Sequence, residues 1–251
     1  MGDDKLSVVE VKNEAERRDR SGGTNPVPTV ESFAKRFLDD YCRAERHKPS
    51  GIAAKETILR LHVLPRWGEK RLNSITTQDV QRLKADLAGK SGKTLNNVLT
   101  VVGKMLKVAV EWDIIERVPC KIRLVKVSIP STSFYDFQQF DRLIPEAKKE
   151  PLELLVDLLG AEAGLRCGEM RGLQWRDVDF SNRTLCVERS IWQDQVTATK
   201  GWRLRHIPLT TRLLNALSLY LRRRSPWVLC RADGRFLTKK QIQKIARRPA
   251  S

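Results

Sequence analysis

The sequence predicts a mainly helical protein with a small β-sheet, built as two domains. Three observations support this fold class. Apolar residues recur at helical spacing over most of the chain from residue 29 onward. The apolar period changes from about 3.6 towards two in 184–189 and 203–209, which is typical of short strands. A stretch with two prolines and no helical period, 119–133, separates two groups of predicted helices.

A length of 251 residues is sufficient for two domains with cores of their own. The first residues mix charges with Ser21, Gly22 and Gly23, a composition that favours a flexible arm over a packed element. The predicted segments are a flexible arm (1–28), a helical domain (29–118), a basic linker (119–133) and a second domain (134–251).

Four helices are expected in the first domain. Phe33, Phe37 and Tyr41 fall on one face of the first helix. The second helix is predicted from about Ile52 to His62, with Pro65 ending it.

Cap residues define the start of the third helix. Thr76 is the predicted N-cap, Asp79 the acid at the third helical position, and Ile75 with Val80 a hydrophobic staple. A fourth helix begins after Ser91 and carries an apolar stripe as far as Val110.

The second domain begins with a helix capped by Asp136, followed by an apolar helix from about Glu153 to a turn at Gly164. Between the two predicted strands, the polar stretch 197–201 is the expected hairpin tip, and it contains Lys200. A leucine-rich helix then closes with Arg222, Arg223 and Arg224, and a last helix is capped at Thr238.

Charge points to the class of partner. The formal net charge of +17 and a pI near 10.0 favour a polyanion, chiefly nucleic acid, with an anionic membrane surface as the second option. The sequence contains no run of about 18 apolar residues and no apolar signal core, so we expect neither a membrane span nor export.

Cysteine and histidine residues are few and dispersed. The five cysteines form no C-x-x-C pair and the three histidines share no ligand spacing, so we expect no metal, no cofactor and free thiols in a reducing cytoplasm. Gly-rich phosphate loops and nucleophile elbows are also absent from the sequence.

The stretch GLRCGEMRGLQWRDVD, 164–179, carries the strongest chemical signal. Arg166 follows an apolar run and precedes Glu169 by three positions. A guanidinium that emerges from apolar surroundings needs an anion, and its planar fork suits two oxygens of a phosphate or carboxylate. The alternative is a structural Arg166–Glu169 surface pair, worth a few tenths of a kcal/mol.

This stretch and the later segment TKGWRLRHIPL, 199–209, resemble two sequence boxes of the tyrosine recombinases, the phage integrase family. The resemblance covers roughly residues 29–248. It implies an N-terminal four-helix core-binding (SAM-like) domain and a partial α/β catalytic domain. It also implies double-stranded DNA as the partner, with other recombinase protomers assembled on it, in a bacterial or phage-type cytoplasm.

The resemblance implies roles for individual residues. Arg166 is similar to the arginine that grips the scissile phosphate, Glu169 to the acidic residue that holds the site together, and Lys200 to the lysine that protonates the departing 5′ oxygen. Such groups suit the reaction because attack on a phosphodiester adds negative charge that fixed cations stabilise. The predicted DNA contacts outside this set are Lys93, Lys104, Lys121, Arg123, Lys126 and Arg205.

The sequence departs from the family pattern after the second box. None of its three histidines begins an H-x-x-R box, and Tyr41, Tyr135 and Tyr220 lack the family's context for a nucleophile. We therefore expect a C-terminally truncated family member limited to DNA binding. The alternatives are a non-catalytic DNA-binding module, acting as a decoy or with a partner that supplies the tyrosine, and a decayed fragment.

Overall fold

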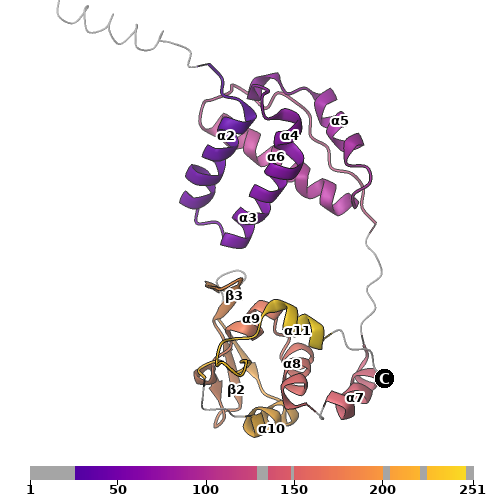
Figure 1. Cartoon of the computed structure of the whole chain (residues 1–251), viewed down its shortest axis with the longest axis vertical. Helices are drawn as coiled ribbons and strands as arrows, with labels where there is room; N and C mark the ends of the chain where they lie inside the picture. The colour runs from indigo at the N-terminus through magenta and orange to yellow at the C-terminus, as the bar shows by residue number, and fades with distance from the viewer. Residues whose placement is uncertain (1–25, 129–134, 148–149, 200–203, 221–224, 247–251) are drawn as a thin grey trace, which may run out of the picture. The chain divides into compact units, whose positions relative to one another are not determined.

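The computed structural model describes residues 26–128, 135–147, 150–199, 204–220 and 225–246. The chain forms two compact units, Met1–Ile129 and Pro130–Ser251 (Figure 1). Among the described residues no helix is both long and apolar enough to cross a membrane.

The first unit is helical. Its elements are α2 (Val30–Arg36), a π-helical turn (Phe37–Cys42), α3 (Pro49–Ile58), a second π-helical turn (Leu59–Val63), α4 (Leu64–Trp67), a 3-10 turn (Leu72–Ser74), α5 (Thr77–Asp86) and α6 (Gly92–Glu111).

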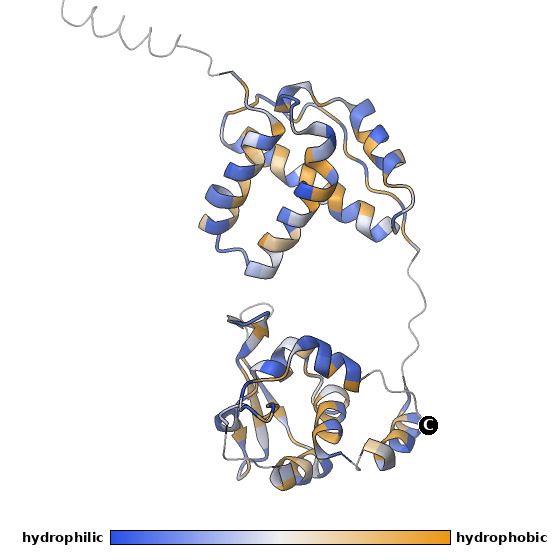
Figure 2. Ribbon diagram, in the orientation of Figure 1, coloured by the Kyte–Doolittle hydropathy of each residue, from blue (hydrophilic) through white to orange (hydrophobic). Residues whose placement is uncertain are grey.

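Its core lies on the apolar face of α6, where residues such as Leu99, Val102 and Leu106 recur every three or four positions and are fully buried. Phe33 and Phe37 pack into the same core, as the sequence predicts. Figure 2 shows apolar residues gathered where the helices of the first unit lie against one another.

Pro65 does not end the second helix, so that prediction was wrong. The chain passes through a π-helical turn and continues as α4 to Trp67, with Pro65 in the first turn of α4. A proline is tolerated there because the first turn of a helix leaves N–H groups without intrahelical partners. The Arg66 guanidinium donates a hydrogen bond to the carbonyl of His62 (3.2 Å), which gives this carbonyl a partner where the π-helical turn meets α4.

The cap predicted at Thr76 is confirmed and reinforced. Thr76 Oγ1 accepts from the N–H of Asp79, and the Asp79 carboxylate accepts from the N–H of Thr76. Lys70 Nζ donates to the same carboxylate at 2.6 Å. The hydrogen bond from Lys70 and then that from Thr76 lower the pKa of Asp79 from 3.8 to about 2.

This shift predicts an acid-sensitive first unit. Because the folded pKa lies below the unfolded one, the stabilisation is complete above about pH 4 and is lost as the pH falls towards 2. We expect Asp79→Asn to lower the free energy of unfolding by on the order of 1–2 kcal/mol at pH 7 and by almost nothing near pH 2. Urea unfolding of both proteins across this pH range measures it. The control Asp86→Asn, in an exposed pair with Arg66, should cost less than about 1 kcal/mol, and an equal loss in both variants would contradict the prediction.

The second unit combines helices with two small antiparallel sheets. Its elements are α7 (Phe137–Ala147), α8 (Pro151–Ala161), α9 (Cys167–Gly172), a 3-10 turn (Trp175–Asp177), β1 (Val178–Asp179), β2 (Thr184–Val187), β3 (Arg189–Trp192), β4 (Gln195–Ala198), β5 (Arg205–Pro208), α10 (Thr211–Tyr220) and α11 (Lys239–Ile245).

The strand order is β1-β2-β5 in one sheet and β3-β4 in the other. The apolar helix α8 lies against α7, α9, α10 and α11 (Figure 1). Leu155, Leu158 and Leu159 of α8 are fully buried at the centre of this unit.

The sheet differs from the prediction at the hairpin tip. Thr197 and Ala198 were expected in the tip, but they pair with Ser190 and Arg189 inside the β3–β4 hairpin. The turn falls at Gln193, whose φ of 52° is left-handed. Sequence reasoning missed this turn because it has neither the glycine nor the asparagine that usually marks such a φ. Thr184–Val187 and Arg205–Pro208 are paired strands, as expected.

Both helix starts predicted from caps in this unit are confirmed. Asp136 accepts from the N–H of Gln139, and Thr238 accepts from the N–H of Gln241. The α7 face is less buried than its sequence indicates, because Phe137 is 91% exposed. Arg222, Arg223 and Arg224 lie outside the described residues.

Candidate functional site

The candidate site begins at the turn between α8 and α9. Gly164 has a φ of 60°, a conformation that a residue with a side chain rarely adopts, and it turns the chain out of α8. The N–H of Leu165 then returns to the carbonyl of Leu159, and the Leu165 side chain is buried. Arg166 follows in an extended conformation as the N-cap of α9. The turn thus buries Leu165 and leaves the side chain of Arg166 59% exposed.

Glu169 is the buried centre of the site. Its side chain is 2% exposed, and its carboxylate accepts from the Arg166 N–H (2.9 Å) and from Arg166 Nη1 (3.1 Å). A buried carboxylate with several charge-assisted bonds is a fixed structural anion. The Arg166–Glu169 pair of the alternative is therefore present, but its carboxylate is buried and not on the surface.

Arg205, on β5, completes the cluster. Its Nη2 donates to Glu169 Oε2 at 2.7 Å, and its side chain is 36% exposed. The guanidinium groups of Arg166 and Arg205, which are 39 residues apart in sequence, therefore meet at one carboxylate. The three groups sum to one positive charge, and the exposed nitrogen atoms of Arg166 can receive an anion from solvent.

Arg171 fixes the orientation of α9. The guanidinium is buried, and it donates to three backbone carbonyls, those of Leu237 (2.8 Å), Ile191 (3.1 Å) and Gln193 (2.6 Å). The ring of Phe236 lies 5.0 Å from it. Burial lowers the pKa of Arg171 below its ordinary value, and the group remains charged at neutral pH.

The close approach of α9 to β3 depends on glycine. A Cβ at Gly168 would lie 2.4 Å from Ser190 Oγ and 3.2 Å from the Ile191 carbonyl oxygen. At the start of β3, the buried Arg189 side chain donates to the Asp177 carboxylate at 2.5 Å. The helix that carries Arg166 and Glu169 is therefore held against a strand on its inner side.

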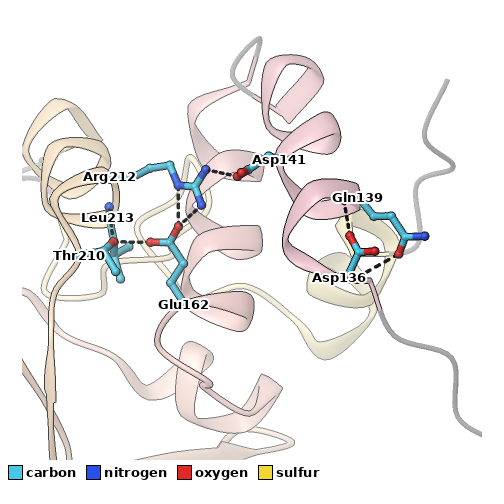
Figure 3. Close-up of polar contacts among 7 residues, drawn as sticks. All are labelled: Asp136, Gln139, Asp141, Glu162, Thr210, Arg212 and Leu213. Carbon is cyan, nitrogen blue, oxygen red and sulfur yellow. Dashed lines mark hydrogen bonds and ion pairs between the residues drawn. The ribbon is translucent and has the colours of Figure 1, made fainter.

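Glu162 joins the end of α8 to the segment that follows β5 (Figure 3). It lies at the end of α8, four residues before Arg166, and accepts from the Thr210 hydroxyl and from Arg212 Nε at 2.5 Å. Arg212 also donates to Asp141 of α7 at 2.7 Å. Thr210 in turn caps α10 by accepting from the N–H of Leu213, so the segment after β5 is tied to the end of α8.

The other predicted site residues fall into three groups. Lys200, the predicted general acid, lies outside the described residues, so its role stays a prediction. Lys104 contacts the protein itself, with Nζ 4.8 Å from the Tyr41 ring and 3.4 Å from Glu111, and its interaction with Tyr41 raises its pKa. The predicted DNA contacts whose side chains are exposed on the first unit are Lys93, Lys121, Arg123 and Lys126.

Sequence reasoning missed the structural roles of Arg171, Arg189 and Glu162. Each looks like a surface charge in the sequence, and only the partner carbonyls and carboxylates reveal burial. All five cysteines are free thiols. Within the described part of the chain no three His, Cys, Asp or Glu side chains are grouped to hold a metal ion.

Comparison with known proteins places this architecture in a family. The profile described as "Phage integrase family" matches residues 134–250, and "Phage integrase, N-terminal SAM-like domain" matches residues 29–87. The ICEBs1 integrase of Bacillus subtilis (strain 168) is 28% identical over 184 residues, which cover 68% of this chain and 49% of that protein. The "Putative defective protein IntQ" of Escherichia coli (strain K12) is 27% identical over 158 residues, 62% of this chain and 37% of that protein. The chain thus spans half or less of the length of these two relatives.

Solved structures show the same fold. The Tn1549 transposon integrase in complex with transposon right end DNA aligns with a TM-score of 0.69 at 18% identity, over 85% of this chain and 78% of that one. A lambda integrase tetramer bound to a Holliday junction aligns with a TM-score of 0.67 at 13% identity, over 98% and 76%. The two matched profiles, the integrase relatives and these folds agree with the two-unit architecture, and the chain belongs to the phage integrase family of tyrosine recombinases.

Proposed function

We propose that this chain binds double-stranded DNA as the core-binding and site-forming part of a tyrosine recombinase, and that Arg166 and Arg205 bind one DNA phosphate together. The observation that carries the proposal is the pair of guanidinium groups on the buried Glu169 carboxylate. Glu169 holds both cations in place before any ligand arrives. A preorganised pair of this kind stabilises added charge on a phosphate without reorganising during the reaction.

In the trans-complemented role, a tyrosine supplied by a partner protomer would bond to the phosphorus as the bond from phosphorus to the 5′ oxygen breaks. Arg166 and Arg205 would neutralise the non-bridging oxygens of that phosphate, and Lys200 would donate a proton to the departing 5′ oxygen. Lys93, Lys121, Arg123 and Lys126 hold the backbone of the duplex, and Lys104 stays a predicted contact. The similar solved structures are integrases bound to DNA, among them a lambda integrase tetramer and a lambda integrase dimer, and we propose that other protomers assemble with this chain on the same DNA. Because the matched relatives come from bacteria, we propose the bacterial cytoplasm as the site of this activity.

The tyrosines within these 251 residues favour binding without a covalent step. Tyr41 stacks on Phe37 in the first core, and Tyr220 is buried in the second. Tyr135 is exposed, and it precedes α7, whose residues do not join the Glu169 cluster. We therefore propose that this segment binds recombination sites, and that a decoy or trans-complemented role is the second candidate.

Salt dependence tests the DNA-binding function. The fluorescence anisotropy of a labelled random-sequence duplex gives the affinity as the salt concentration rises. If about four phosphates are neutralised, the affinity should fall about a hundredfold between about 50 and 200 mM salt. The charge-reversal variant Lys126→Glu should bind DNA more weakly than the variant Glu56→Lys. Glu56 is an exposed side chain on α3. Binding that does not respond to salt would contradict the proposed function.

A further inference from the structure

The stretch 119–128, here called the strap, is predicted to be a linker but lies on the surface of the first unit. It contains neither helix nor strand. Cys120 is buried, and Ile122 and Val125 pack against the first core. The N–H of Lys121 donates to Thr77 Oγ1 at 3.0 Å, which ties the start of the strap to the first turn of α5.

Asn96 of α6 holds the middle of the strap. Its Nδ2 donates to the carbonyl of Val125 at 2.9 Å, and its Oδ1 accepts from the N–H of Val125 at 2.8 Å. A side-chain amide offers both a donor and an acceptor in one plane, as a neighbouring strand does. Both backbone groups of Val125 are therefore satisfied by one side chain, and this contact is partly buried.

Glycine makes room for the strap along the same helix. A Cβ at Gly92 would lie 3.1 Å from Val127 Cγ2, and one at Gly103 would lie 3.7 Å from Ile122 Cδ1. Positions 92, 96 and 103 fall on one face of a helix. Because these positions meet residues 127, 125 and 122 in turn, the strap runs antiparallel to α6 in a track lined by small and amide side chains.

The exposed residues of the strap include three cations beside the apolar side chains of Leu124 and Val127. Lys121, Arg123 and Lys126 are exposed, and the strap has no acidic residue. None of the three forms an ion pair with a residue that the structure describes. The five steps from Lys121 to Lys126 cover roughly 16 Å of extended chain at ~3.3 Å per residue, which is long enough for the three cations to face successive phosphates of one DNA strand.

We propose that Asn96 is a positioning residue that fixes the strap before DNA arrives, so that Lys121, Arg123 and Lys126 form a preformed row for the duplex phosphates. The proposal rests on the DNA-binding function proposed above. A free linker with the same charges would have to be ordered on binding, and this ordering lowers affinity. Because Asn96 holds Val125 in the free protein, the entropy cost of ordering the strap is met when the first unit folds and not when DNA binds.

The test uses the full chain with Asn96→Ala and the matched control Asn97→Ala, which changes an exposed neighbour on the same helix. Hydrogen exchange of the amides at 121–127 reports the order of the strap. Anisotropy titration of a random-sequence duplex at several salt concentrations reports binding. We expect Asn96→Ala to speed exchange at Val125 at least about tenfold and to weaken binding about five- to tenfold. The salt slope should stay unchanged, because the same phosphates are neutralised in the complex.

Thr77→Val removes the second anchor without touching α6 and should act in the same direction, by about two- to threefold, if Asn96→Ala folds poorly. The inference is overturned if Asn96→Ala loosens the strap but binds DNA as the wild type does, or if Asn97→Ala weakens binding equally. Absence of salt-dependent binding by the wild type would instead refute the DNA-binding function itself, so the two failures are distinguishable.

Discussion

Replacing Arg171 with methionine is expected to lower the free energy of unfolding of the second unit by about 3–5 kcal/mol. Arg171 is 4% exposed, and its guanidinium donates to the carbonyls of Leu237, Ile191 and Gln193. Methionine fills much of the volume but donates no hydrogen bond, so three carbonyls lose their partner and α9 loses its link to the segment before α11. Urea unfolding of the full chain, with the two units distinguished by hydrogen exchange, measures the loss.

Arg176→Met is the matched control for Arg171→Met. Arg176 lies five residues further on, its side chain is 71% exposed, and its nitrogen Nη2 lies 3.9 Å from the carboxylate of Glu188. We expect this variant to change stability by less than about 0.5 kcal/mol. Equal stabilities of the two variants would show that the buried contacts of Arg171 contribute little.

Glu169→Gln is expected to cost about 2–3 kcal/mol of the same unfolding free energy, less than breaking a fully buried ion pair costs, because both arginines are partly exposed. The amide keeps the shape of the carboxylate. Its NH₂ group, however, meets N–H donors of Arg166 or Arg205, and the two guanidinium groups lose the charge between them. Urea unfolding as for Arg171→Met gives the value.

Asp141→Asn separates the effect of burial from that of charge. Asp141 also pairs with an arginine, Arg212 at 2.7 Å, but its side chain is 62% exposed (Figure 3). Removing this charge should cost less than about 1 kcal/mol. If Asp141→Asn were as destabilising as Glu169→Gln, the claim that a buried carboxylate organises the site would be wrong.

Local signals in the sequence were sufficient for the helix starts and the class of fold. The caps at Thr76, Asp136 and Thr238 are short-range patterns in which a side chain satisfies an N–H three residues on, so the residues themselves predict the geometry. The turn at Gly164 is equally local, because it depends on a φ of 60° at one residue and glycine adopts this φ readily. The same reasoning correctly paired the strands on either side of 189–204.

Long-range polar contacts were not predictable in the same way. The meeting of Arg205 with Glu169 spans 36 residues, and nothing in either segment specifies the other as its partner. The roles of Arg171 and Asn96 depend on backbone carbonyls and N–H groups that every residue possesses, so composition carries no signal for them. At Pro65, the proline occupies the first turn of α4, where a missing N–H costs no intrahelical hydrogen bond, so the local tendency of proline to end a helix did not decide the structure.

The salt dependence of DNA binding tests directly whether Arg166 and Arg205 hold one phosphate. It is measured for Arg166→Ala, Arg205→Ala and the double variant on one random-sequence duplex. If both guanidinium groups hold one phosphate, each single variant changes the slope of log affinity against log salt by less than about 0.5, and the double variant changes it by about 0.9. If the two arginines bind separate phosphates, each single variant removes about 0.9 and the double variant about 1.8. That second pattern, or slopes that stay at the wild-type value in all three variants, would contradict a shared phosphate at the Glu169 cluster.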